Sequence, residues 1–335
     1  MKRRSCTLAW MTLGWAALAL GGCALLLPNR PPVASFTLDD TDGYAPLTVR
    51  LDGRESYDPD GQIVAYRWIV SDERVVEGGV AEHTFTASGS FTVRLEVEDR
   101  DGAVGTAAVT IVVRRPPEGY LARRREWDHG GVHHTWDLLV PEALYEEYAG
   151  RVQTSFSDRY RYDVYVADPL DDPTLESFGR ELLDRVGGDP VAFLECALAF
   201  VQGAIRYALD TPGLEQPRYP LETLVDGKGD CEDAAILYVN LVNALDADAS
   251  LAFVDTDGDR SPDHVTALVP VPTFYSGQLH CGGTTRERLF VFDGELLALA
   301  EASVAVEETG YIALGCDPWG LDEEDVIQRW TFEEP

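Results

Sequence analysis

The residues best suited to chemistry in this sequence surround Cys231, within the stretch GKGDCEDAAILY at residues 227–238. Asp230 is a suitable helix N-cap, and Asp233, three residues later, could complete a capping box. Cys231 is therefore expected in the first turn of a helix, where unpaired N–H groups and the helix dipole favour a thiolate. Apolar residues that recur at helical spacing predict one apolar face on this helix: Ala234, Leu237, Tyr238, Leu241 and Leu245.

A cysteine nucleophile needs a general base, and the base needs a partner that orients it. His264 opens an apolar run, to Pro270, that predicts a short strand, and Glu301 ends another predicted strand at residues 296–301. Asp293 is the alternative acid, although the dipeptide Asp-Gly in which it lies is typical of a hairpin turn. The chain order is thus a cysteine on a helix, a histidine on a strand and an acid on another strand.

Structural interpretations of these residues remain open. Cys231 could be a buried helix cysteine, and His264 could be a surface histidine on its strand. Glu232 and Asp233 would oppose a thiolate at Cys231 unless a protonated His264 stands beside it. Gln202 could donate to an oxyanion or make a structural hydrogen bond.

These motifs and their order resemble the transglutaminase-like superfamily, which has a papain-type fold. The resemblance runs from about Trp127 to the C-terminus. Its matching motifs are FVQ at 200–202, IRY at 205–207, YPLETL at 219–224 and GDCED at 229–233.

The resemblance implies that Cys231 is the nucleophile and His264 the general base. It assigns the acid position to Glu301, where most members of the superfamily have aspartate. Members include thiol proteases, protein cross-linking enzymes and amidases, and also inactive relatives.

The preceding segment, residues 33–114, is predicted to be all β. Phe91, Val93, Leu95 and Val97 alternate with polar residues, and DPDG at 58–61 and DRDG at 99–102 are turn signals. The segment resembles a PKD domain, through the motifs PPVASF at 31–36, APLTV at 45–49, SYDPDG at 56–61, YRW at 66–68 and VED at 97–99. The resemblance implies an immunoglobulin-like spacer or adhesion module, which could bind cell-envelope proteins or polysaccharide. Trp68 is expected in its core.

The expected fold is therefore multidomain: an all-β immunoglobulin-like PKD sandwich, followed by an α+β domain of the papain-like, transglutaminase-like type. The expected domains are a tether at 23–32, the sandwich at 33–114, a linker at 115–126 and the transglutaminase-like domain at 127–335. Helices are predicted at 173–186 and 190–207. Cys196, on the apolar stripe of the second helix, is expected to pack as a hydrophobic residue.

The N-terminus has the pattern of an export signal. Lys2, Arg3 and Arg4 precede an apolar run at residues 8–20, which is too short for a membrane span. The sequence Leu-Gly-Gly-Cys that ends at Cys23 resembles a lipoprotein lipobox. It implies a signal peptide at 1–22 and a lipid anchor on Cys23, and so a membrane-anchored protein at the cell surface or in the periplasm. A simple cleaved signal or a short N-terminal anchor is the alternative.

The chain is strongly acidic, with a formal charge of −31 over 335 residues, and its lysines are Lys2 and Lys228. Such a surface excludes the nucleic-acid-binding classes that depend on basic patches. The hydrophobic content of 45% is ordinary for a folded protein.

The sequence leaves both the metal sites and the disulfide open. Asp255, Asp257, Asp259 and Asp263 have the spaced oxygens of a calcium loop, but an ordinary acidic turn explains them too. No cofactor is required by the proposed chemistry, and calcium is possible. The histidines His129, His133 and His134 are expected to be solvated loop residues rather than metal ligands. Cys281 and Cys316 could form a disulfide outside the cytoplasm, although their spacing does not establish it.

Together these features predict acyl transfer at a peptide or carboxamide carbonyl through a Cys-His-acid triad. Water as the second nucleophile would make the protein a cysteine peptidase or amidase, and an amine would make it a protein cross-linker. The alternative is a non-catalytic surface protein, for adhesion or as a scaffold, that uses both domains for binding.

Overall fold

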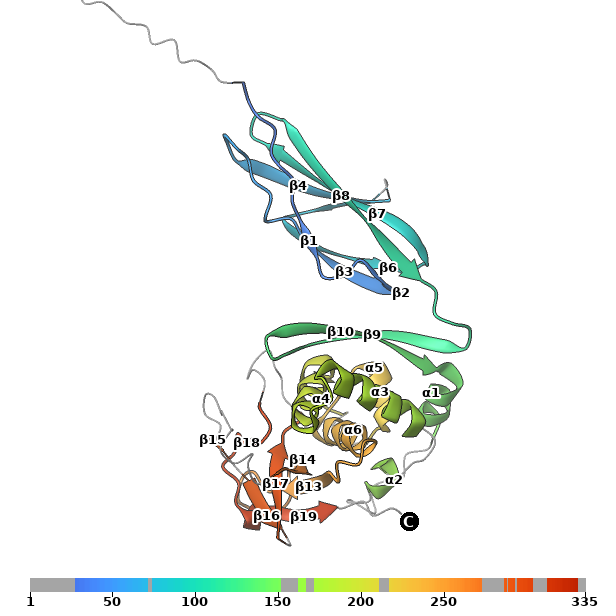
Figure 1. Cartoon of the computed structure of the whole chain (residues 1–335), viewed down its shortest axis with the longest axis vertical. Coiled ribbons are helices and arrows are strands. Elements are labelled where there is room, and N and C mark those ends of the chain that lie inside the picture. The colour runs from blue at the N-terminus through green and yellow to red at the C-terminus, as the bar shows by residue number, and fades with distance from the viewer. Residues whose placement is uncertain are drawn as a thin grey trace, which may run out of the picture. The chain divides into compact units, whose positions relative to one another are not determined.

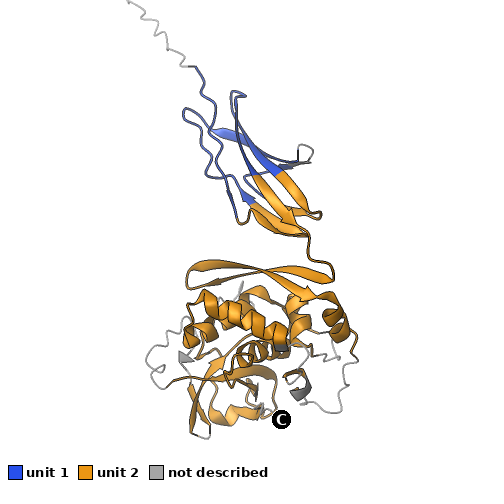
Figure 2. Ribbon diagram, turned by 45° about the vertical axis from the view of Figure 1, so that its right-hand side comes forward, with its two compact units in different colours: residues 1–38, 51–81, 92–109 blue, residues 39–50, 82–91, 110–335 orange. Residues whose placement is uncertain are grey.

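The structure is a computed structural model, and it describes residues 28–71, 74–151, 162–166, 172–210, 217–272, 286–287, 289–292, 294–303 and 312–330. The chain divides into two compact units: residues 1–38, 51–81 and 92–109 form the first, and residues 39–50, 82–91 and 110–335 the second (Figure 2). Every helix and every strand from Tyr120 onward belongs to the second unit. Within the described ranges, none of the helices combines the length and the apolar character needed to cross a membrane.

The N-terminal part is all β, as predicted, with two sheets in the orders β1-β3-β6 and β2-β8-β7-β4-β5 (Figure 1). The strands are β1 (Thr37–Leu38), β2 (Asp42–Tyr44), β3 (Leu47–Asp52), β4 (Ile63–Val70), β5 (Arg74–Glu77), β6 (Val80–Phe85), β7 (Gly89–Asp99) and β8 (Val104–Arg114). In β7, Val93, Leu95 and Val97 are fully buried, because alternate side chains of a strand face the core. Trp68 is also fully buried, and its indole donates to the Gly78 carbonyl at 2.9 Å, so its predicted core position is confirmed.

The C-terminal part combines helices with an antiparallel sheet. Its first elements are β9 (Tyr120–His129), β10 (Val132–Pro141), α1 (Glu142–Ala149), α2 (Asp163–Val166), α3 (Asp172–Arg185), α4 (Pro190–Ala204), β11 (Arg206–Tyr207), α5 (Pro220–Asp226), β12 (Lys228–Gly229) and α6 (Cys231–Asn243). Its later elements are β13 (Ser250–Val254), β14 (His264–Pro270), β15 (Arg286–Glu287), β16 (Leu289–Phe292), β17 (Glu295–Ala300), β18 (Cys316–Asp317), η2 (Glu323–Asp325) and β19 (Val326–Trp330). The sheet order is β16-β17-β14-β13-β19.

Both faces of this sheet are covered. Leu251 and Phe253 of β13 pack into the core shared with the helices, whereas Ala252 and Val254, which alternate with them, pack with Leu299 and others on the opposite face. Helix α6 contacts α3, α4 and α5 as well as β14 (Figure 1). Its residues from Glu232 to Val242 are all buried. The prediction of a single apolar face on this helix is therefore wrong, because the helix is enclosed on all sides.

The helix predicted at 190–207 forms as α4, and it shows how the sequence begins a helix. Asp189 is its N-cap and accepts from the backbone N–H groups of Val191 and Ala192, both at 2.9 Å. Pro190 occupies the first helical position, where its missing N–H costs nothing. Helix α4 ends at Ala204, and Arg206 and Tyr207 form the short strand β11 instead.

The predicted linker at 115–126 is partly wrong, because β9 already begins at Tyr120 and pairs with β10 along its whole length. The arginines at 123–125 concealed this strand, since consecutive charges do not resemble a buried strand. Arg125 donates to the carbonyls of Leu224 and Val225 at the end of α5, at distances of 2.6–3.0 Å. Its charge is therefore used to bind the last turn of a helix.

Candidate active site

Cys231 opens helix α6, as predicted, and follows two glycines with distinct roles. Gly227 ends α5 with a φ of 65°, a conformation that strains residues with a Cβ. Strand β12 pairs in parallel with β11, so that Gly229 lies opposite Tyr207. A Cβ at Gly229 would lie 2.5 Å from the Cβ of Asp233, which is too close for any other residue without a shift.

The predicted capping box at the start of α6 is wrong. Asp230 occupies the N-cap position but makes no side-chain capping hydrogen bond. The carboxylate of Asp233 instead accepts from the backbone N–H of Arg218 at 2.7 Å. Burial, followed by the charge of Asp230, raises the pKa of Asp233 to about 8. Asp233 thus ties the segment before α5 to the helix that carries the cysteine.

The strands that carry His264 and Glu301 are neighbours in the sheet. β14 begins with His264 and pairs with β17, and Glu301 directly follows the last residue of β17. The Nε2 atom of His264 lies 3.0 Å from Oε2 of Glu301. The other oxygen, Oε1, accepts from the backbone N–H and the hydroxyl of Ser303, at 2.9 and 2.6 Å. The structure therefore brings His264 and Glu301 together.

The surroundings of Glu301 favour its ionised form. The side chain is 1% exposed, and this burial by itself would raise the pKa. The charge of His264 and the hydrogen bonds from His264 and Ser303 outweigh burial, so that the pKa of Glu301 is lowered. An ionised Glu301 can accept from the imidazole and hold its orientation.

The side chain of Cys231, on α6, contacts the beginning of β14, the strand that His264 opens. The backbone of Val265, the next residue, is hydrogen-bonded to Cys231. The Sγ atom also donates to Oε2 of Glu232 at 3.2 Å. The contact with Glu301 engages Nε2 of His264 and not Nδ1.

The local charges oppose a thiolate at Cys231. Burial, then the charge of Glu232, its hydrogen bond and the charge of Asp230, raise the pKa of the thiol well above its ordinary range, against the backbone hydrogen bond from Val265. A helix dipole contributes about 0.3–1 kcal/mol at an exposed terminus, which is too little to offset burial of a charge beside carboxylates. The prediction that the first turn favours a thiolate is therefore wrong here, and the resting form is the thiol.

The hydrogen-bond partners of Gln202 are backbone groups. Its Nε2 donates to the backbone carbonyls of Glu301 and Ile312, at 2.6 and 2.8 Å, and its Oε1 accepts from the N–H of Ile312 at 3.1 Å. Both amide hydrogens are thus engaged by carbonyls in a side chain that is 3% exposed. Of the two roles considered for Gln202, the geometry supports the structural hydrogen bond and not the oxyanion donor, because Gln202 fixes the backbone that carries Glu301.

One described cavity, of about 320 Å³, is lined in part by Gln202 and Ile312. Its lining includes His129, Glu195, Leu198 and Leu314. Cys231, His264 and Glu301 are absent from this lining, so the cavity is separate from the candidate active site.

Two aromatic residues beside the site were not singled out as site residues from the sequence. The indole of Trp319 lies against the imidazole of His264, with 4.5 Å between ring centroids. Burial, followed by the charges of Cys231 and Asp230, raises the pKa of Tyr207 to about 12, so its hydroxyl stays protonated. Tyr207 falls within the motif IRY, which could have drawn attention to it, whereas nothing local in the sequence marks Trp319.

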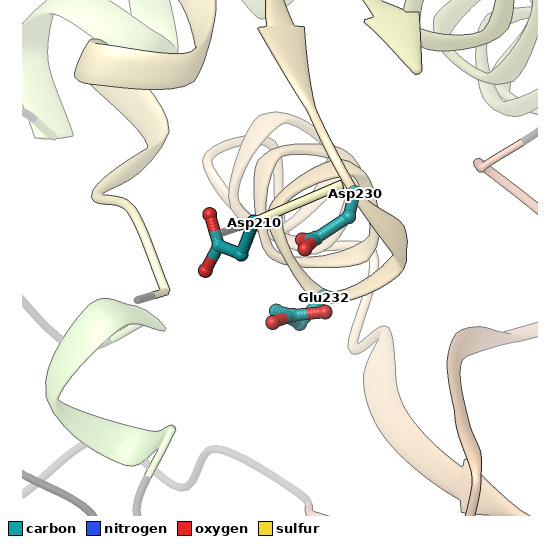
Figure 3. Close-up of side chains that lie close together, drawn as sticks. All are labelled: Asp210, Asp230 and Glu232. Carbon is teal, nitrogen blue, oxygen red and sulfur yellow. The ribbon is translucent and has the colours of Figure 1, made fainter. Parts of the chain in front are cut away.

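Three carboxylates gather around the N-terminus of α6. Asp210, Asp230 and Glu232 each place one oxygen within 4.8 Å of the others (Figure 3). Asp230 and Glu232 flank Cys231 in the sequence, and both are buried. Carboxylate oxygens at this spacing could hold a divalent cation such as calcium. The sequence did not predict this convergence, because Asp210 comes from a separate segment.

The acidic loop between β13 and β14 brings together three of its four predicted calcium ligands. Asp255, Asp257 and Asp263 place oxygens within 4.8 Å of one another, and Asp259 lies outside this group. Asp255 accepts from three backbone N–H groups of the loop, at 2.5–3.2 Å, and these lower its pKa although burial opposes the shift. The loop can therefore close by internal hydrogen bonds, and its oxygens could also hold a cation.

The predicted histidine and cysteine sites have mixed outcomes. The prediction that His129, His133 and His134 lie in a loop is wrong, because His129 ends β9 and the other two lie in β10. His133 contacts Asp128 at 3.0 Å and His134 stacks on Trp127, and these histidines belong to neither group of metal-like ligand atoms among the described residues. Cys196 is a free, fully buried cysteine whose pKa is raised by burial, so its predicted packing role is confirmed. Cys316 is disulfide-bonded. The other candidates, Cys23, Cys281 and Asp293, lie outside the described residues.

Two curated proteins resemble this chain over part of its length. Over 140 residues the chain is 28% identical to Collagenase ColA of Clostridium perfringens, covering 41% of this chain and 12% of that protein. Over 93 residues it is 31% identical to the dyslexia-associated protein KIAA0319 homolog of Mus musculus, covering 26% of this chain and 8% of that protein. The chain thus spans about a tenth of the length of these curated relatives.

Among solved structures, the PKD1 domain of Vibrio anguillarum Epp is 35% identical, with a TM-score of 0.23, and the match covers 26% of this chain and 99% of that domain. The family model of the PKD domain matches residues 29–113. These are the residues that form the two N-terminal sheets. The N-terminal part of the chain is therefore a PKD domain, as its sequence motifs predicted.

Proposed function

We propose that the C-terminal part of the chain is a thiol enzyme of the transglutaminase-like type, which transfers the acyl group of a peptide or carboxamide. The observation that carries this proposal is the 3.0 Å contact between His264 and Glu301 beside the helix that begins with Cys231. On this proposal Cys231 is the nucleophile, His264 the base and Glu301 the orienting acid, each supplied by a separate segment of the chain. Such a triad is recognised by geometry and roles rather than by sequence position.

The proposed reaction begins with transfer of the thiol proton of Cys231 to Nδ1 of His264. Because burial and Glu232 hold the thiol protonated, this transfer accompanies attack of sulfur on the carbonyl carbon. Glu301 stabilises the imidazolium that forms. The N–H groups at the start of α6 stabilise the oxyanion of the tetrahedral intermediate.

Collapse of the intermediate breaks the carbon–nitrogen bond. His264 returns the proton to the leaving amine, and the acyl group remains on Cys231 as a thioester. Water or a second amine then attacks the thioester, with His264 again accepting the proton, and the free thiol is restored. Water gives a peptidase or amidase, and an amine gives a cross-linker.

The second candidate function is binding without catalysis, as an adhesion or scaffold protein. The PKD match at residues 29–113 favours it, because such a domain can serve as a surface-binding module for proteins or polysaccharide.

We further propose that the protein lies outside the cytoplasm and is anchored to a membrane by a lipid on Cys23. A Cys23→Ser variant should leave the membrane fraction or fail to mature, since stable anchoring needs lipid chains. Unchanged membrane retention would contradict the lipid anchor.

The catalytic proposal is tested by offering the protein casein together with a fluorescent primary amine. Hydrolysis is followed as new amino termini, and cross-linking as fluorescence incorporated into casein. Either product should be lost in Cys231→Ala and in His264→Ala, which act as one unit, and retained in Cys196→Ala. Product formation that persists in Cys231→Ala would contradict Cys231 as the nucleophile, and the absence of both products in wild type would favour a binding function.

A further inference from the structure

Trp319 packs against the proposed catalytic base. Its ring centroid lies 4.5 Å from that of His264, with 56° between the two planes. The His264 side chain is 15% exposed, and Trp319 itself is 37% exposed. The indole thus packs against a mostly buried imidazole and is itself partly exposed to solvent.

The loop that carries Trp319 is held by one buried carboxylate. Asp317 is 1% exposed and accepts from three consecutive backbone N–H groups, those of Trp319 at 2.7 Å, Gly320 at 2.9 Å and Leu321 at 2.5 Å. Hydrogen bonds to an ionised acceptor are stronger than those between neutral groups. The position of the indole is therefore determined by the loop and not only by its own packing.

The same loop is joined to the strand that presents the acid. The N–H of Gly315 donates to the carbonyl of Leu299 in β17, at 2.7 Å, two residues before Glu301. Cys316 is disulfide-bonded, and Leu321 packs against the sheet in the cluster that contains Leu299. One strand thus supports both the carboxylate that binds Nε2 of His264 and the loop that covers its ring.

We propose that Trp319 is a positioning residue, which covers the His264–Glu301 pair and fixes the imidazole, with Asp317 holding it in place. The inference rests on the proposed function, because it assigns His264 the role of general base. Excluding water beside the pair strengthens its hydrogen bond, since electrostatic interactions grow as the local dielectric falls. A fixed ring also keeps Nδ1 in line with the thiol.

The first test measures the cover and does not depend on activity. Diethyl pyrocarbonate modifies exposed imidazoles, and mass spectrometry of peptides gives the rate at each histidine. In Trp319→Ala, the rate at His264 should rise by roughly fivefold or more, because the ring loses its shield from water. Trp319→Phe should stay close to wild type, and His133, whose side chain is 50% exposed, serves as the internal control. An unchanged rate at His264 in Trp319→Ala would overturn the proposal even if the protein proves to be an enzyme.

The second test measures positioning. In Trp319→Ala, kcat for acyl transfer should fall roughly tenfold, while KM changes little. This loss is a part of the rate enhancement that general base catalysis contributes. Asp317→Asn keeps the indole but weakens the loop that holds it. It should therefore raise the modification rate at His264 and lower kcat, each by less than Trp319→Ala does. Greater reactivity of His264 with unchanged kcat would overturn the positioning role. If no acyl transfer is found in wild type, the proposed function fails, and the reactivity of His264 still decides whether Trp319 covers it.

Discussion

The Nε2 atom of His264 lies 3.0 Å from Oε2 of Glu301, a carboxylate that is 1% exposed and held from its other side by Ser303. A glutamate is one methylene longer than the aspartate that the family resemblance leads one to expect. The position of Glu301, directly after β17, accommodates that length, because the strand ends beside the start of β14.

Replacing this acid tests its role. Glu301→Gln keeps the shape but cannot stabilise an imidazolium, so the acyl-transfer rate should fall roughly 100-fold while some activity remains. Ser303→Ala removes one of the hydrogen bonds to Oε1 and serves as the milder matched variant. Initial rates at constant substrate measure both. A Glu301→Gln rate equal to wild type would contradict an orienting role.

Gln202 is expected to support Glu301 through the backbone. In Gln202→Leu, the carbonyls of Glu301 and Ile312 lose their donor, and each buried polar group left unsatisfied costs about 1–3 kcal/mol. Both the melting temperature and the activity should therefore fall. An oxyanion role predicts a lower kcat with an unchanged melting temperature, and that pair of results would contradict the structural assignment.

Asp233 gives the folded state a distinctive dependence on pH. Its pKa is raised to about 8, whereas an unfolded aspartate titrates near ~3.9. Between these values the folded state holds a proton that the unfolded state has lost, so stability should fall as the pH rises from about 4 to about 8.

The measurement is urea unfolding of wild type and Asp233→Asn at several pH values. Asp233→Asn removes the titrating group, so its free energy of unfolding should decline less than that of wild type over this range. Parallel pH profiles for the two proteins would show that Asp233 remains ionised beside Arg218.

A calcium titration tells apart the two groups of carboxylates, the one in the loop at 255–263 and the one formed by Asp210, Asp230 and Glu232. If the loop at 255–263 binds calcium, the melting temperature should rise with calcium concentration, because an ion that binds only the folded state stabilises it. Asp257→Asn should remove that response, and Asp210→Asn, in the other group, is the matched control. Magnesium at equal ionic strength reports general screening. A calcium response that persists in Asp257→Asn would exclude the loop as the binding site, and its loss in Asp210→Asn would assign the ion to the carboxylates beside Cys231.

The sequence predicted the parts of the site that depend on local pattern. The glycines before Cys231 and the helical spacing after it predicted a helix that begins at the cysteine, and apolar runs predicted the strands that present His264 and Glu301. These signals are local, because a helix start and a strand are determined within a few residues.

The parts that the sequence did not predict depend on contacts between distant segments. Trp319 reaches His264 only because its loop returns to β17, and Gln202 finds its partners on the backbone after that strand. The raised pKa of Cys231 follows from burial among α6, Glu232 and β14, which a helix-dipole argument leaves out. Arg125 resembled part of a charged linker because its partners, the last carbonyls of α5, lie far along the chain.

The central claim is that Cys231 is a nucleophile served by His264, and competitive alkylation tests it most directly. The protein is treated with limiting iodoacetamide at neutral pH, and mass spectrometry gives the labelling rates of Cys231 and Cys196, both free thiols. Cys231 should label at least roughly tenfold faster than the fully buried Cys196, and this preference should disappear in His264→Ala, because His264 accepts the thiol proton as sulfur attacks. Equal rates in wild type, or a preference that survives in His264→Ala, would contradict the account.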